Sequence, residues 1–239
     1  MPSIWLPDAR PATAGSLDDE FRDASSGVPS GWTEVDHGGH LVVDEDEIGL
    51  QLTQATHAGN SVSGIYKTIP AGDFTIYTKV SLSCLIATDT AYAGLAMWED
   101  ATSSTGNVFT FGLRMDLTRG PYIICQTWTQ YDDAAPVTFG TLLDLGQTTY
   151  PTHLYLRMRR TGTNYSTDVS LTGLGWQTIN GGDGAADAIS FTPTHVGPFM
   201  NNAASGVTVD ARFAFFRYVA SNEGDNGIMQ GDRIEIVNV

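Results

Sequence analysis

The chain has 239 residues, of which 27 are acidic and 12 are lysine or arginine, so its formal net charge is −15. A field of this sign repels nucleic acid phosphates and anionic membrane surfaces, which excludes both as expected partners. Apolar residues make up 41% of the chain and glycine is frequent, at 26 residues. This composition predicts a packed core built from many short segments that turns connect.

The first 16 residues contain three prolines with small residues between them, and they predict an extended N-terminal arm over residues 1–16. Ile4, Trp5 and Leu6 form an apolar triplet in this arm, and they are expected to pack on the chain's own domain or on a neighbouring subunit. The segment lacks the basic start and continuous apolar stretch of a secretory signal, and no segment has the length of apolar chain that crosses a bilayer. We therefore expect synthesis in the cytoplasm without export.

Alternating apolar residues begin at Leu41. Residues 41–52 predict a hairpin whose turn is the acidic stretch 44–47. Residues 74–84 predict a strand with two different faces. Phe, Ile, Thr, Val, Leu and Cys occupy alternate positions and form one face, and the residues between them form a polar, solvated face. Residues 91–98 and 108–116 predict a further pair of strands, the second with Phe109, Phe111, Leu113 and Met115 on one face.

The second half continues the same pattern. Strands are predicted in 122–130 and 137–145, and residues 155–171 predict an antiparallel hairpin that turns at 161–164, with a third strand begun by residue 179. The last alternating stretch, residues 207–219, predicts inward-facing residues at alternate positions, namely Val207, Val209, Ala211, Phe213 and Phe215.

No segment keeps a helical period for more than a couple of turns, and about a dozen short strands follow one another along the chain. This order predicts two stacked antiparallel sheets. We expect one domain over residues 17–220, preceded by the arm and followed by a turn-rich link and a strand over residues 221–239. That last strand either closes the sandwich or pairs with the edge of another subunit.

Several segments occur in a familiar order: "DDEF…GW", "IYKTIPAGDFTIYTKVSL", "YAGLAMWED", "LYLRMRRTGTNYSTDVSLTGLGWQTI", "THVGPFMNN" and "ARFAFFRYV". Together they resemble the concanavalin A-like lectin/glucanase jelly rolls, in particular the non-catalytic accessory domains found beside β-xylosidases. The resemblance covers residues 17–220 and implies an all-β, concanavalin A-like antiparallel β-sandwich. Its motifs are core and turn residues, so they bear on the fold more than on activity.

The residues that would carry catalysis are not arranged for it. Glycoside hydrolysis needs two carboxylates at a defined separation, and catalytic jelly-roll glucanases place them as Glu-x-Asp-x-x-Glu, a pattern that this sequence lacks. Glu99 is a lone acid, no Gly-x-Ser-x-Gly elbow occurs, and the five histidines are scattered. We therefore predict that the protein is not an enzyme. Cys84 and Cys125 lie in apolar strand patterns, which favours buried free thiols, while a disulfide between them stays open.

Sugar binding would use aromatic faces together with side chains that reach hydroxyl groups. The candidates lie close together in the sequence: Trp98, Trp128, Tyr131, Asp132, Asp133 and Asn107. Core packing is the favoured alternative for Trp98 and an equal alternative for Trp128. The acidic stretches 44–47, 131–133 and 223–232 offer oxygen ligands suited to calcium, but none matches an EF-hand and each reads equally as a solvated turn, so neither a metal nor another cofactor is predicted.

A jelly roll with free tails and no pair of catalytic acids resembles bacteriophage structural proteins. The expected function is therefore a non-enzymatic virion protein of a tail, fibre or head decoration, held by Ile4, Trp5 and Leu6 of the arm. Its expected partners are other virion proteins, further copies of itself and a glycan on the host surface. The alternative is a free-standing carbohydrate-binding lectin, or an accessory domain of a polysaccharide-degrading enzyme.

Overall fold

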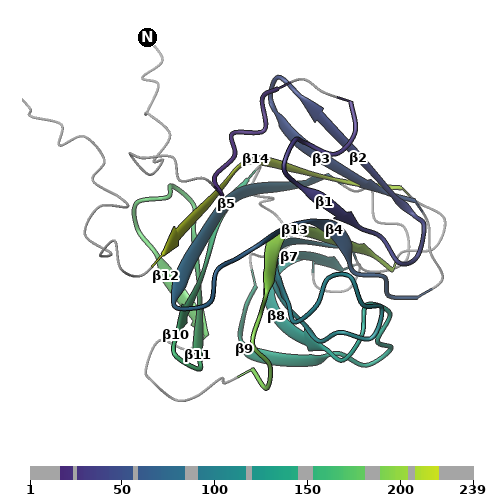
Figure 1. Cartoon of the computed structure of the whole chain (residues 1–239). Coiled ribbons are helices and arrows are strands. Elements are labelled where there is room, and N and C mark those ends of the chain that lie inside the picture. Colours follow the sequence, from purple (N-terminus) through teal and green to yellow (C-terminus); the bar gives the residue numbers. More distant parts are fainter. Residues whose placement is uncertain are drawn as a thin grey trace, which may run out of the picture.

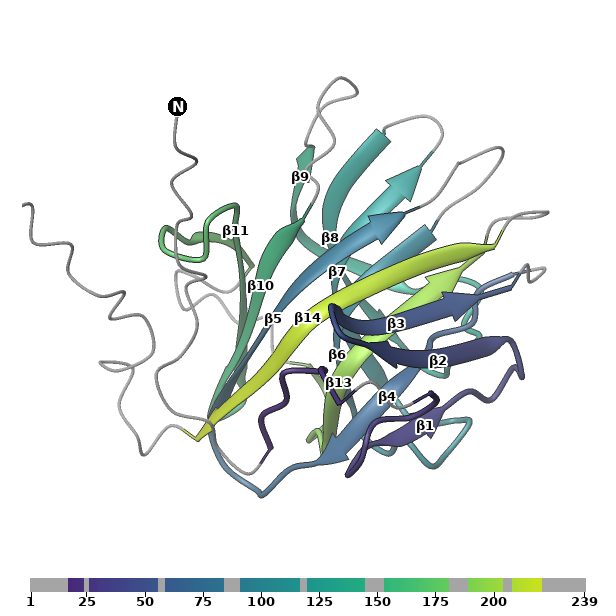
Figure 2. The ribbon, with the colours of Figure 1, turned by 90° about the horizontal axis from the view of Figure 1, so that it is seen from above.

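The computed structural model describes residues 17–23, 26–55, 59–83, 91–116, 120–144, 153–180, 189–203 and 208–220. Within them the protein is all-β, with fourteen strands in two antiparallel sheets of seven strands each (Figure 1). The two sheets are stacked as the layers of a sandwich (Figure 2), which confirms the predicted jelly-roll β-sandwich. No helix in the described residues is long and apolar enough to cross a membrane.

Sheet 1 has the order β1-β4-β13-β6-β7-β8-β9. Its strands, in that order, are β1 (Thr33–Val35), β4 (Ser63–Thr68), β13 (His195–Asn202), β6 (Ala91–Trp98), β7 (Val108–Asp116), β8 (Gly120–Trp128) and β9 (Val137–Asp144). Sheet 2 has the order β12-β11-β10-β5-β14-β3-β2. Its strands are β12 (Gln177–Asn180), β11 (Asn164–Ser170), β10 (Leu154–Thr161), β5 (Phe74–Ser83), β14 (Val209–Ala220), β3 (Gly49–Gln54) and β2 (Leu41–Asp46).

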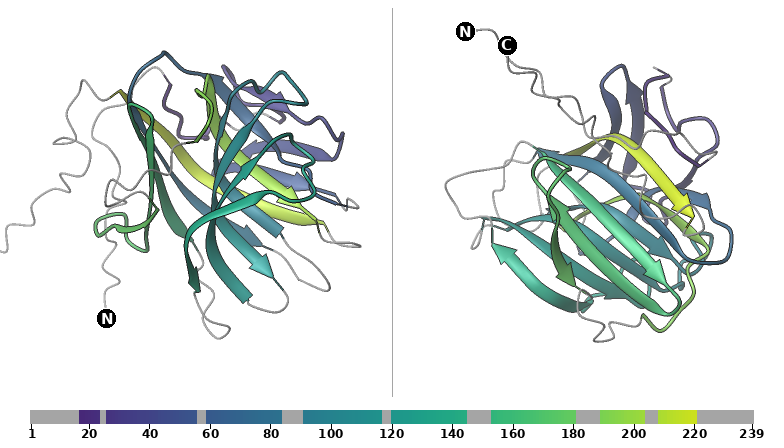
Figure 3. Two further views of the ribbon diagram at one scale, coloured as in Figure 1. Left: turned by 90° about the horizontal axis from the view of Figure 1, so that it is seen from below. Right: turned by 90° about the vertical axis from the view of Figure 1, so that its left-hand side faces the viewer.

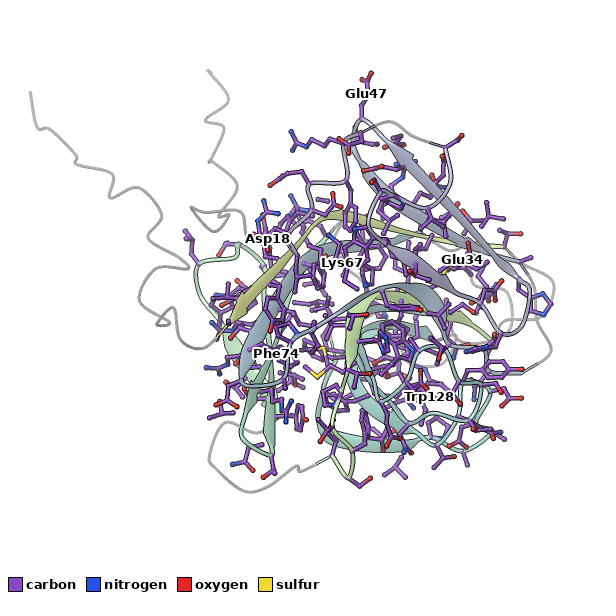
Figure 4. The ribbon with its side chains drawn as sticks, in the orientation of Figure 1. Asp18, Glu34, Glu47, Lys67, Phe74 and Trp128 are labelled. Carbon is purple, nitrogen blue, oxygen red and sulfur yellow. The ribbon has the colours of Figure 1, made fainter. Side chains whose placement is uncertain are left out.

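The main core lies between the sheets, because successive side chains of a strand point to opposite faces. From sheet 1 it takes Phe109, Phe111, Leu113 and Met115 of β7, the face that the alternation predicts. From sheet 2 it takes the alternate residues of β5 that begin with Phe74, which Figure 4 labels between the layers.

The predicted hairpin of residues 155–171 is confirmed. β10 and β11 pair from Tyr155↔Ser170 to Thr161↔Asn164, which leaves a two-residue turn at Gly162 and Thr163. Gly162 has φ +63°, a conformation that glycine adopts without steric cost. β12 then pairs with β11, so these three strands form one end of sheet 2, which is foremost in the right panel of Figure 3.

Two local predictions are wrong. The acidic stretch 44–47 is not a hairpin tip, since β2 runs to Asp46 and buries Glu45, and the turn follows at Glu47 and Ile48. Figure 4 shows Glu47 at the tip. Phe215 does not face the main core, because a bulge between Phe213 and Phe216 adds a residue to β14 and turns Phe215 to the outer face.

The segment before β1 is fixed to sheet 2 by its acidic residues. Asp19 forms an isolated bridge with Phe216, and its carboxylate accepts a hydrogen bond from the Trp32 indole at 2.7 Å. Lys67 lies 3.8 Å from the same carboxylate and 4.6 Å from the Trp32 ring centre, and burial lowers the pKa of its ammonium group. Figure 4 shows Lys67 and Asp18 in this region. The "DDEF" motif therefore has a structural role, because it attaches the segment before β1 to sheet 2.

Some predictions fall outside the described residues: the arm with Ile4, Trp5 and Leu6, the residue Cys84, and the C-terminal strand over residues 233–239. Cys125 is described, and it is buried without a disulfide to any described residue, with its Sγ 3.2 Å from the Thr167 hydroxyl.

Candidate functional site

The outer face of sheet 1, which points away from the main core, carries a second buried cluster of side chains. On β8 it takes the residues of even number, so Trp128 shares a face with Tyr122 and Ile124. The remaining members come from the neighbouring strands and loops: Val35, Val62, Tyr66, Tyr92, Ala96, Trp98, Ala101, Val108 and Phe199. A sheet face that carries a buried cluster of this kind can contain a pocket whose floor is formed by the strands of the sheet.

A pocket of about 280 Å³ opens on this face. It is lined by Asn60, Tyr92, Arg114, Gln126, Trp128, Ala134, Ala135, Pro136 and Asn201. Its volume lies just below the range of roughly 300–1,000 Å³ for ligand pockets, so it suits a single small ring better than a long polymer. No described residue that lines it carries a carboxylate.

Strand register brings the floor of the pocket together. Asn201 of β13 is opposite Tyr92 of β6, Tyr92 is opposite Arg114 of β7, and Arg114 is opposite Tyr122 of β8. The four residues form one row across the sheet. Their strands, β13, β6, β7 and β8, are neighbours in sheet 1 (Figure 2). Gln126 lies on the same face of β8, four residues along the strand from Tyr122.

Next to this row, Gly94 of β6 is opposite Gly112 of β7. A Cβ atom on Gly94 would lie 2.2 Å from the Phe111 carbonyl oxygen, and one on Gly112 would lie 2.1 Å from that of Ala93. Neither strand could keep its position with a side chain at these points. The glycine pair therefore lets β6 and β7 approach closely beside the pocket floor.

The loop 129–136 forms the outer wall, and Asp133 holds its shape. One carboxylate oxygen of Asp133 accepts hydrogen bonds from the Thr129 amide at 3.0 Å and the Thr129 hydroxyl at 2.8 Å, while the other accepts from the Ala135 amide at 2.9 Å. The amide of Thr129 is the main cause that lowers the pKa of Asp133. The Asn60 side chain ties the wall to the floor by donating to the Asp133 carbonyl at 2.8 Å.

The polar groups of the floor are fixed before any ligand arrives. Asn201 donates to the Asn60 side-chain oxygen at 3.1 Å and accepts from the Ser61 amide at 2.8 Å. The Tyr92 hydroxyl donates to the Ile124 carbonyl at 2.9 Å, and burial raises the pKa of Tyr92 well above its ordinary value. Tyr92 is therefore a neutral hydrogen-bond donor, not a base.

Trp128 is equally fixed, since its indole N–H donates to the Thr110 hydroxyl at 2.8 Å. Only 1% of Trp128 is exposed, so it offers little surface for stacking and acts mainly as a rigid wall. Figure 4 labels Trp128 on the β7–β8 side of the molecule, away from Phe74 in the main core. Gln126 donates weakly to Thr138, at 3.5 Å, and no described group donates to its side-chain oxygen.

The structure brings together some of the predicted sugar-binding residues and separates others. Trp128 lines the pocket and Asp133 shapes its wall, while Asp132 is exposed on the same loop. Tyr131 packs against His37, with 5.2 Å between ring centres, and does not line the pocket. The role of these residues in binding stays a prediction.

Trp98 and Asn107 lie elsewhere. Trp98 is buried in the outer cluster near Tyr66, with 6.5 Å between their ring centres. The Asn107 side chain donates to Glu99 at 2.6 Å, so Glu99 closes the loop between β6 and β7 and is engaged there.

Sequence reasoning did not connect Asn60, Tyr92, Arg114, Gln126 and Asn201 with a site. The sequence offers only a weak signal for them, such as the polar character of Arg114 at a position that alternates with the apolar residues Leu113 and Met115. The sequence shows which face each residue occupies, but only the pairing of the strands shows that these faces meet.

No family model and no curated protein matches the sequence. Solved structures do share the fold. A GH43 protein, BlXynB from Bacillus licheniformis, has a TM-score of 0.59 and 18% identity over 86% of this chain. The chain spans 39% of the length of that protein.

Two further structures are similar over nearly their whole length. One comes from work on endo-acting O-glycanases that the human gut microbiota expresses to initiate mucin breakdown. It has a TM-score of 0.58 and 13% identity, and the match covers 86% of this chain and 98% of the other. The other is a mutant of the alginate lyase Aly36B in complex with an alginate tetrasaccharide, with a TM-score of 0.54 and 13% identity, covering 87% and 98%. At these identities the likeness shows the shared fold.

Proposed function

We propose that this protein is a non-catalytic carbohydrate-binding domain, and that its pocket on the outer face of sheet 1 holds one sugar residue of a glycan. The observation that carries the proposal is the lining of the pocket, in which amide side chains from three strands or loops surround a small cavity with aromatic walls. Amides supply both donors and acceptors, which is what the hydroxyl groups of a sugar require.

The absence of carboxylates from the described lining supports a binding role over hydrolysis. A hydrolase needs two acids on opposite sides of the scissile bond, about 5–10 Å apart. Asp133 is the acid nearest to the pocket in the described loop, and both of its oxygens hold the loop together. Glu99 closes a different loop with Asn107.

The comparisons also favour this interpretation over the virion interpretation. Among the similar structures, one is an alginate lyase in complex with an alginate tetrasaccharide, and another comes from work on O-glycanases that initiate mucin breakdown. None of those cited points to a phage particle. A place in a virion and an assembly role for the arm remain untested predictions.

The test is a binding screen of the purified chain against neutral and acidic monosaccharides and oligosaccharides by NMR titration. We expect Gln126→Ala to weaken sugar binding about tenfold, because it removes a hydrogen-bonding group from the floor. Gln177→Ala is the matched control, since Gln177 is exposed on β12 of the other sheet. Binding that survives Gln126→Ala unchanged would place the site elsewhere. Glycan cleavage that is lost on substitution of a pocket residue would show that the domain is catalytic.

A further inference from the structure

Arg114 is the charged residue of the described pocket lining. Its Nε atom is buried and has no hydrogen-bond partner. Its guanidinium carbon lies 5.8 Å from the centre of the Tyr122 ring, which supports one face of the group. Among the acids whose side chains the structure describes, none forms an ion pair with Arg114.

Other arginines of the described strands are neutralised by acids of the chain. Arg157 and Arg159 both contact the buried Asp168, at 2.9 and 3.2 Å, and Arg212 contacts Asp46 at 2.7 Å. With 27 acidic residues against 12 basic ones, the sequence offers acids in excess. Arg114 differs from these three arginines, because no acid among the described side chains contacts it.

A guanidinium group does not lose its proton in proteins, so burial cannot neutralise it as it can a lysine or a carboxylate. Partial burial of the charge carries a free-energy cost unless a counter-charge is supplied. The planar fork of N–H donors matches the two oxygens of a carboxylate or a sulfate. A ligand that carries such a group would supply a negative charge next to the guanidinium group of Arg114.

The rest of the lining suits a hydroxylated ring beside this anion. Gln126 keeps its side-chain oxygen, and Asn60 and Asn201 each keep an N–H that no described group accepts. The net charge of −15 acts against an anionic ligand at long range. Salt screens that repulsion beyond about 8 Å at physiological ionic strength, so the adjacent guanidinium decides the interaction in the pocket.

We infer that the pocket binds an acidic sugar, whose carboxylate or sulfate oxygens accept hydrogen bonds from Arg114. The inference rests on the proposed carbohydrate-binding function and narrows its ligand class. The two sources of the anion are a uronic acid and a sulfated hexose, which share the oxyanion chemistry that Arg114 recognises.

The experiment compares matched monosaccharides that differ at one position. Glucose, glucuronate and glucose 6-sulfate are titrated into the full chain at pH 7 and followed by NMR, with the corresponding galactose and mannose series beside them. We expect an acidic member to bind about 10- to 100-fold more tightly than its neutral parent, as a charge-assisted hydrogen bond predicts. A preference for the uronate identifies a carboxylate site, and a preference for the sulfate ester identifies a sulfate site.

Arg114→Gln should remove the preference for the acidic sugar. Arg22→Gln changes an exposed arginine that is distant in the sequence from Arg114, and it should leave the preference intact. Arg114→Lys keeps the charge without the fork and should retain part of the preference. The comparison of matched sugars on the unaltered protein does not depend on whether the Arg114 variants fold.

Two results would overturn the inference, and they are distinguishable. Neutral and acidic sugars that bind equally well, in a manner that Gln126→Ala weakens, would refute the acidic ligand and leave the carbohydrate-binding function standing. If no sugar of either kind binds, both proposals fail.

Discussion

Replacing Asp133 tests whether the loop 129–136 acts as the wall of the pocket. Asp133→Ala removes three hydrogen bonds, to the Thr129 amide at 3.0 Å, the Thr129 hydroxyl at 2.8 Å and the Ala135 amide at 2.9 Å. The bond from Asn60 to the Asp133 carbonyl is made by the main chain, so the substitution leaves it in place. The Val62 amide also donates to the Tyr131 carbonyl at 2.8 Å, so the loop should stay attached at these two points and lose only the order that the Asp133 carboxylate provides.

The size of the effect follows from these contacts. A hydrogen bond contributes about 0.5–1.5 kcal/mol net, and this loop is partly exposed, so the three together should stabilise it by about 1–2 kcal/mol. That free energy corresponds to local opening that is about 5- to 30-fold more frequent in Asp133→Ala. Sugar affinity should fall by no more than the same factor, because only the closed loop completes the pocket.

The assay is amide hydrogen exchange at Ala135, together with sugar titration. Asp132→Ala is the control, since Asp132 is the exposed neighbour on the same loop. Because the native fold lowers the pKa of Asp133, its stabilisation is present above the unfolded pKa of about 3.9 and is lost as the pH falls toward the native value. Unchanged exchange at Ala135 and unchanged sugar affinity in Asp133→Ala would refute this account of the wall.

Three further substitutions test the frame around the pocket by urea unfolding. Gly94→Ala should destabilise the fold by about 1–3 kcal/mol, because its Cβ would lie 2.2 Å from a carbonyl oxygen, whereas Gly175→Ala meets no atom within 4 Å and should be neutral. Asp168→Asn should lower the free energy of unfolding by about 3 kcal/mol, because it leaves Arg157 and Arg159 of sheet 2 without their buried counter-charge. A variant as stable as the original protein would show that these ion pairs are replaceable. Burial lowers the pKa of His195, so the free energy of unfolding should decline as the pH falls below 6.5; a His195→Asn variant that declines equally would exclude this group as the cause.

The faces of the long strands were predictable from the sequence. In β5 and β7 one face packs in the main core, so apolar residues recur at every second position and fix the phase. The same parity places Trp128 with Tyr122 and Ile124, outside the main core. Parity does not show whether that outer face is solvated or covered, because the buried cluster on it is assembled from several strands and loops of the chain.

The errors occurred where a strand departs from regular alternation. In β14 the bulge between Phe213 and Phe216 adds one residue without any local mark, so a strict period of two assigns Phe215 to the wrong face. In β2 the acidic residues indicate a solvated turn, yet Glu45 is 3% exposed, and its carboxylate accepts a hydrogen bond from the Asp23 amide, 22 residues earlier. Neither outcome is encoded by residue type within a short window.

The pocket could not be predicted because it depends on register across sheet 1. Asn201 and Tyr92 are far apart in the chain and meet only because β13 pairs with β6, and Arg114 joins them only because β6 pairs with β7. A slip of β7 by one residue would exchange its two faces, moving Arg114 into the core and Leu113 out of it. The penalty for burying Arg114 in that core fixes the register, and the same register aims its guanidinium into the pocket. Core packing and the proposed recognition of a ligand would therefore be two consequences of one alignment of strands, the same alignment that brings the polar lining of the pocket together.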